Sequence, residues 1–90
     1  MRIVILDGAE MTGRDRLHDY LSRELRLPDY YGHNLDALYD CLGELGPHTH
    51  IILVNADILR SNLGEYGERL IEVFRESAVP GSVHFTVDGE

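Results

Sequence analysis

The stretch LPDYYGHNLDALYDCL, residues 27 to 42, contains the clearest helical pattern in the chain. At about 100° per residue, the apolar side chains after position 34 gather on one side of a helix, which must be the buried side. These side chains are Leu35, Leu38, Cys41 and Leu42. Asp36, Asp40 and Gly43 fall on the opposite side. The segment therefore predicts an amphipathic helix that presents two carboxylates, one turn apart, to solvent.

Local helix stability explains only one of these two aspartates. Asn34 is a good N-cap, so Asp36 lies in the first turn, where the helix dipole favours a negative charge. Asp40 lies in the last turn, where the dipole opposes it. A like-charge neighbour four residues away adds a further cost of roughly 0.2–0.5 kcal/mol. Because stability does not account for Asp40, we interpret the exposed acidic side as functional.

The charge distribution indicates a basic partner. The chain has 16 acidic and 8 basic residues, a formal net charge of −8, and no Lys or Arg lies between Arg26 and Arg60. Nucleic-acid binding requires clustered cations that neutralise phosphates, and this segment has none. We therefore expect no direct contact with nucleic acid and a positively charged protein partner.

Three stretches have the pattern of β-strands: RIVIL at 2–6, IILV at 51–54 and SVHFTV at 82–87. The first two are continuous apolar runs, which are expected of strands covered on both faces. The third alternates, so Val83, Phe85 and Val87 should face the core while His84 and Thr86 face outwards.

Helical patterns occupy the chain between the strands. Thr12 followed by Asp15 resembles a capping box, and an apolar stripe that includes Leu17 and Leu21 continues until Pro28. Further helices are expected over 34–42, 56–63 and 65–78. Strands separated by such long connections favour parallel pairing. We expect one domain over residues 1–90, an α/β fold with a small three-stranded parallel sheet packed with about four helices.

Three tyrosines, Tyr30, Tyr31 and Tyr39, surround the predicted acidic surface. Tyrosines beside charges that become desolvated often contribute much of the binding energy at protein interfaces. The alternative is that one or two of these rings pack in the core, and for Tyr31 both interpretations stay open.

These residues resemble the signature segment of the barstar family, the intracellular protein inhibitors of secreted microbial ribonucleases. The likeness extends to RLHDYLSREL at 16–25, which is similar to the first helix of the family, and to VFRES at 73–77, which is similar to its last helix. The resemblance implies a barstar-like fold over nearly the whole chain. It also implies an inhibitor that enters a ribonuclease active site, not an enzyme.

The resemblance further implies roles for individual residues. Asp40 would occupy the site of a substrate phosphate, Asp36 would flank it, Tyr30 would be the aromatic contact of the preceding loop, and Glu76 would be an acidic contact on the last helix. The residues expected to bind the partner are Tyr30, Asn34, Asp36, Tyr39, Asp40, Gly43, Glu44 and Glu76.

Three departures from the family pattern leave the identity of the target nuclease open. Tyr39 stands where the family has tryptophan, the following loop reads GELGP without another tryptophan, and Pro80 replaces a further acid. The expected partner is a basic ribonuclease, either barnase-like or another guanyl-specific microbial nuclease.

Other interpretations of the same residues are weaker. His33 with Asp36, or His48 with His50, could share a metal, but such exposed pairs are more often solvated. No phosphate-binding loop or activated nucleophile supports catalysis by Asp36 and Asp40, so no cofactor or metal is expected. The main alternative to ribonuclease inhibition is a generic acidic interaction module whose basic partner is not a nuclease.

The N-terminal apolar run is too short for a signal peptide or a membrane span. Cys41 is the single cysteine, which suits a reducing compartment, and as a residue of an apolar helix face it is expected to pack in the core. We therefore expect a cytoplasmic protein without membrane contacts that is monomeric when free.

Overall fold

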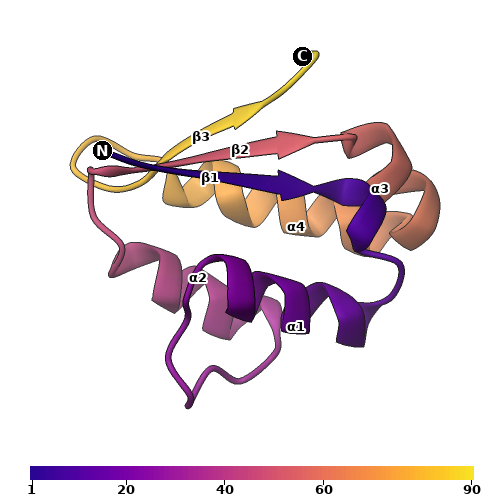
Figure 1. Ribbon diagram of the computed structural model, residues 1–90, viewed down its shortest axis with the longest axis horizontal. Coiled ribbons are helices and arrows are strands. Elements are labelled where there is room, and N and C mark those ends of the chain that lie inside the picture. Colours follow the sequence, from indigo (N-terminus) through magenta and orange to yellow (C-terminus); the bar gives the residue numbers. More distant parts are fainter.

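The computed structural model describes residues 1–90 and consists of a sheet with helices on one side of it (Figure 1). The strands β1 (Arg2–Asp7), β2 (Thr49–Val54) and β3 (His84–Val87) pair in parallel in the order β1-β2-β3. Arg2 lies opposite Thr49, and His50 lies opposite His84. The predicted three-stranded parallel sheet is confirmed.

The connections between the strands are helical, as predicted. A 3-10 turn, η1 (Gly8–Glu10), is followed by α1 (Arg14–Glu24) and α2 (Leu35–Gly43) before β2. The second connection contains α3 (Ala56–Leu63) and α4 (Glu65–Ser77). The predicted capping box at Thr12 is wrong, because the N-cap of α1 is Gly13 and no side chain caps this helix.

The expectation that the first two strands are covered on both faces is wrong for the first strand, and in the second strand the residues of one face are only half-buried. Ile3 is 60% exposed and Ile5 is 58% exposed, while Val4 and Leu6 are buried. Both connections step in the same direction across the sheet, from β1 to β2 and from β2 to β3. Crossover connections that have the same handedness and step in the same direction place their helices on the same face of the sheet. The other face of the sheet therefore stays open (Figure 1).

The core lies between the sheet and the helices as one cluster of 21 buried residues. The third strand is oriented as predicted, with Val83 and Val87 buried and His84 and Thr86 exposed. Phe85 is half-buried and stacks on Phe74 of α4, with ring centroids 5.0 Å apart. This packing fixes α4 beneath the sheet, where it lies next to α2.

Candidate functional site

The beginning of α2 is fixed by its N-cap. The Asn34 Oδ1 accepts a hydrogen bond from the Ala37 amide at 2.8 Å, and the Asn34 Nδ2 donates one to the Gly32 carbonyl at 3.1 Å. The cap satisfies one of the free amides of the first turn and joins the helix to the loop that precedes it. The two hydrogen bonds of Asn34 therefore fix both the start of α2 and the course of the loop before it.

The loop before α2 is anchored through Tyr31. This residue is buried, and its hydroxyl lies 2.5 Å from the His18 Nδ1 of α1. The other ring nitrogen of His18, Nε2, lies 2.7 Å from the Tyr66 hydroxyl of α4. Burial, the largest cause, lowers the pKa of His18, and burial also raises the pKa of Tyr31. Of the two interpretations of Tyr31, the structure supports the core position.

The acidic side of α2 faces solvent as the helical pattern predicts. Leu35, Leu38, Cys41 and Leu42 are buried, while Asp36 and Asp40 are exposed. Neither carboxylate forms an ion pair within the chain. Burial is the largest cause that raises the pKa of the Cys41 thiol, which agrees with a packing role for this residue. The side of α2 that bears Asp36 and Asp40 is available for a partner.

Two grooves between α2 and α4 bring the predicted acids of the two helices together. One, of about 210 Å³, is lined by Tyr39, Asp40 and Gly43 of α2 and by Glu76 of α4, among others. The other, of about 160 Å³, contains Asp36 and Glu76. Residues far apart in the sequence thus form one acidic surface, which we define as Asp36, Asp40, Glu72 and Glu76.

Three of the predicted contact residues, Tyr30, Asn34 and Glu44, lie outside these grooves. Tyr30, in the loop before α2, is 77% exposed, and Glu44 is the exposed C-cap residue of α2. Tyr39 is 48% exposed beside Asp40. Asn34 lies at the start of α2, in a separate depression beside Asp36. Tyr30 therefore presents aromatic surface on the loop before α2, and Tyr39 presents aromatic surface on α2 itself, beside the carboxylates.

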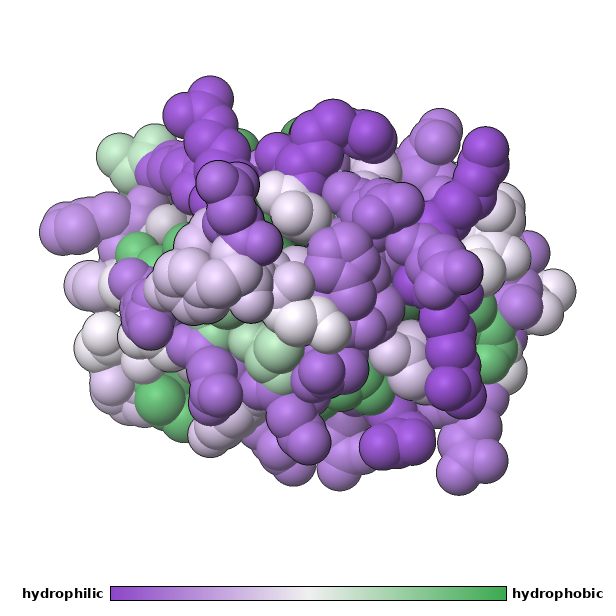
Figure 2. Space-filling model, turned by 90° about the horizontal axis from the view of Figure 1, so that it is seen from below, coloured by the Kyte–Doolittle hydropathy of each residue, from purple (hydrophilic) through white to green (hydrophobic).

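Sequence reasoning missed other residues that line the grooves, namely Arg69, Glu72, Val73, Ser77, Val79 and Ser82. Their role depends on how α4 packs against α2, which the sequence pattern does not specify. One signal was present: residues 69, 72 and 76 recur at helical spacing on α4. The helix side of the molecule is largely hydrophilic, with small apolar patches between the polar side chains (Figure 2).

His33 and His50, one from each of the pairs considered above as weaker metal-site alternatives, have other neighbours in the structure. His33 lies near Asp19, with the Nδ1 and carboxylate oxygen 3.6 Å apart, and its ring packs next to Tyr31. The His50 Nε2 lies 2.8 Å from the Thr86 hydroxyl of the neighbouring strand. No three His, Cys, Asp or Glu side chains are grouped so that they could hold a metal ion.

Comparison with known families matches residues 1–86 to the family described as "Barstar (barnase inhibitor)". The chain belongs to the barstar family. It is also 41% identical, over 78 residues, to the Bacillus subtilis (strain 168) protein named "Putative ribonuclease inhibitor YrdF", and the match covers 86% of each chain. Barstar-family proteins are inhibitors and not enzymes, so catalysis by Asp36 and Asp40 is set aside.

None of the helices has the length and apolarity needed to cross a bilayer.

Proposed function

We propose that this barstar-family protein inhibits a small, basic microbial ribonuclease by inserting α2 and the loop before it into the active-site cleft. The observation that carries the proposal is the acidic surface: Asp36, Asp40, Glu72 and Glu76 border two adjoining grooves, and none has an intramolecular ion-pair partner. A ribonuclease lines its cleft with cations that hold the phosphates of RNA. Exposed carboxylates on a rigid helix are a suitable substitute for those phosphates.

Within this proposal, Asp40 occupies the position of the substrate phosphate. It lies in the groove formed with Glu76, so two carboxylates can face the cations of one cleft. Asp36 contacts a flanking cation, one turn nearer the N-terminus of α2. These charges are already fixed on the helix surface before binding, and such preorganisation lowers the cost of association.

The remaining predicted residues supply contacts around the acids. Tyr30 and Tyr39 give exposed aromatic surface, a frequent source of binding energy at interfaces. Asn34 holds the loop against α2, while Gly43 and Glu44 meet the rim of the cleft. The partner is a barnase-like or other guanyl-specific ribonuclease, bound by a monomeric inhibitor in the cytoplasm without direct contact with nucleic acid.

The proposal is tested by titrating purified microbial guanyl-specific ribonucleases, including nucleases encoded beside the gene, with the wild-type protein while RNA cleavage is followed. We expect the activity of at least one enzyme to disappear at one equivalent of inhibitor. An acidic protein with no effect on RNA itself serves as the control for non-specific charge effects. If every enzyme in the panel stays active, the protein is an acidic interaction module with a partner other than a nuclease.

A further inference from the structure

A separate depression of about 550 Å³ lies beside the acidic surface, at the beginning of α2. It is formed by the start of α1, by the stretch from His33 to Asp36 and by α4. Arg14 and Arg69 contribute two guanidinium groups to it, and Asp15 and Asp36 contribute two carboxylates. The depression therefore places cations at the border of a surface that is otherwise acidic.

Neither of these arginines forms an ion pair within the chain. By contrast, Arg60 and Arg75 are paired with Glu90, and Arg60 is also paired with Glu68. Although Asp15 and Asp36 line the same depression, they do not approach Arg14 or Arg69 within ion-pair distance. The hydrogen-bond donors of both guanidinium groups are available to an external acceptor.

The guanidinium group of Arg14 lies over the ring of Tyr66. Its guanidinium carbon lies 4.1 Å from the centroid of the Tyr66 ring, and the Tyr66 hydroxyl lies 2.7 Å from the Nε2 of buried His18. Stacking on an aromatic face leaves the edge of a guanidinium free to bind a carboxylate. Arg69 lies three residues after Tyr66 on α4, and it lines both this depression and the groove that contains Asp36.

A partner that covers this surface would remove water from both guanidinium groups. Burying a charge without a partner is strongly unfavourable, so a close interface requires an acceptor here. We propose that the depression binds an aspartate or glutamate side chain from the rim of the ribonuclease cleft and thereby selects the cognate enzyme. This inference rests on the proposed function. Alternating charges, with enzyme cations at Asp36 and an enzyme acid at Arg14 and Arg69, would fix the register of the complex and reject enzymes that lack the acid.

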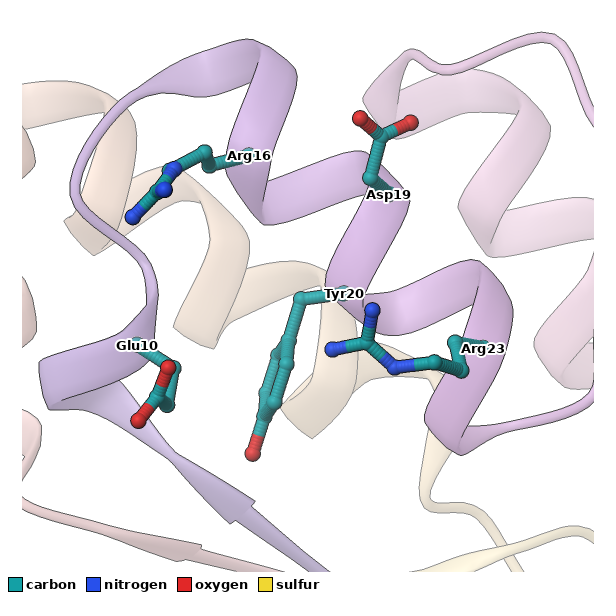
Figure 3. Close-up of a pocket in the computed structure, with 5 residues that line it drawn as sticks. All are labelled: Glu10, Arg16, Asp19, Tyr20 and Arg23. Carbon is teal, nitrogen blue, oxygen red and sulfur yellow. The ribbon is translucent and has the colours of Figure 1, made fainter.

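The test compares two double variants that change the net charge equally. The first, Arg14→Gln with Arg69→Gln, removes the cations of the depression. The control, Arg16→Gln with Arg23→Gln, removes two exposed and unpaired arginines of α1 that line a different depression with Glu10, Asp19 and Tyr20 (Figure 3). Inhibition constants are measured for both against the enzyme that the wild-type protein inhibits, and melting curves verify that both variants fold.

Binding of an enzyme acid and net charge alone predict changes of opposite sign in the inhibition by the first double variant. If the depression binds an enzyme acid, the first double variant inhibits at least about tenfold more weakly than wild type. The control, which is more acidic than wild type, inhibits equally or more tightly, because a more negative protein is attracted more strongly to a basic enzyme. When the rim acids of the enzyme are replaced by their amides, the wild-type protein and the first variant should have equal inhibition constants.

Each other outcome has a distinct meaning. If the wild-type protein inhibits an enzyme and the two double variants behave alike, the carboxylate subsite is wrong while ribonuclease inhibition stands. If the wild-type protein inhibits no enzyme in the panel, the proposed function fails and the subsite fails with it. If the first variant is weaker but amidation of the rim acids changes nothing, the two arginines act on the stability of the inhibitor surface, and the subsite is wrong.

Discussion

At the scale of single residues, Asp40 is unfavourable for the free protein. It lies in the last turn of α2, where no basic residue offsets the helix dipole, and Asp36 lies one turn away. We expect Asp40→Ala to leave the free energy of unfolding unchanged or to raise it by up to about 1 kcal/mol. Denaturant unfolding of the free domain measures this. A loss of stability larger than the experimental error would show that Asp40 has a structural role.

His18 makes the stability of the fold depend on pH. Because its pKa is lowered in the folded state, mainly by burial, the unfolded chain binds a proton at a higher pH than the folded chain. The contribution to stability is therefore fully present above the unfolded pKa of about 6.5 and is lost as the pH falls below it, with a slope of at most about 1.4 kcal/mol per pH unit.

This pH dependence can be assigned to His18 with one variant. His18→Gln removes the titrating group, so the loss of stability that begins as the pH falls below about 6.5 should disappear, although the variant is less stable at every pH. Denaturant unfolding at several pH values measures both effects. A slope that persists in the variant would assign the dependence to another group. The lowered pKa of Asp7 acts in a different window, below the 3.8 of the unfolded carboxyl.

At the scale of elements, the N-cap of α2 contributes to the stability of the helix that carries the proposed binding surface. Asn34→Ala removes the 2.8 Å bond to the Ala37 amide and should cost about 1 kcal/mol of folding free energy. Asn34→Asp keeps an acceptor at the same position and should lie within a few tenths of a kcal/mol of wild type. Unfolding curves of the two variants check this. Equal destabilisation by both would mean that the hydrogen bond from Asn34 Nδ2 to the Gly32 carbonyl matters more than the cap.

The elements also show what the sequence could predict. The helical pattern of residues 34–43 was sufficient to identify the buried and exposed sides of α2, because the helical repeat alone determines which side chains share a face. The apolar run at the first strand did not reveal that Ile3 and Ile5 are exposed, since coverage depends on the direction of the connections. The cluster of His18, Tyr31 and Tyr66 was likewise hidden, because it joins three segments distant in sequence.

At the scale of the whole molecule, the family resemblance located Asp36, Asp40 and Glu76 of the acidic surface, but not the other charged residues of α4 that line its grooves. Glu72 and Arg69 enter the site only because α4 packs beside α2. The resemblance also could not indicate that Arg14 and Arg69 are unpaired. Such features follow from the packing of helices and from distances between charged groups, which a single sequence does not provide.

The net charge of −8 has a kinetic consequence for the molecule as a whole. Association with a basic enzyme should be steered electrostatically, so the association rate constant should fall by roughly tenfold or more between low salt and physiological salt. The dissociation rate constant should change much less. Stopped-flow mixing at several salt concentrations measures both constants. An association rate that does not depend on salt would contradict steering by the acidic surface.

The most direct test of the central claim compares two single substitutions of equal charge change against an enzyme that the wild-type protein inhibits. Asp40→Asn alters the acidic surface, while Asp57→Asn alters an exposed aspartate in the first turn of α3, outside both grooves. The measurement is the inhibition constant of each variant. We predict that Asp40→Asn weakens inhibition by at least about thirtyfold and that Asp57→Asn stays within about twofold of wild type. Equal inhibition by the two variants would contradict the claim that α2 binds the ribonuclease cleft through Asp40.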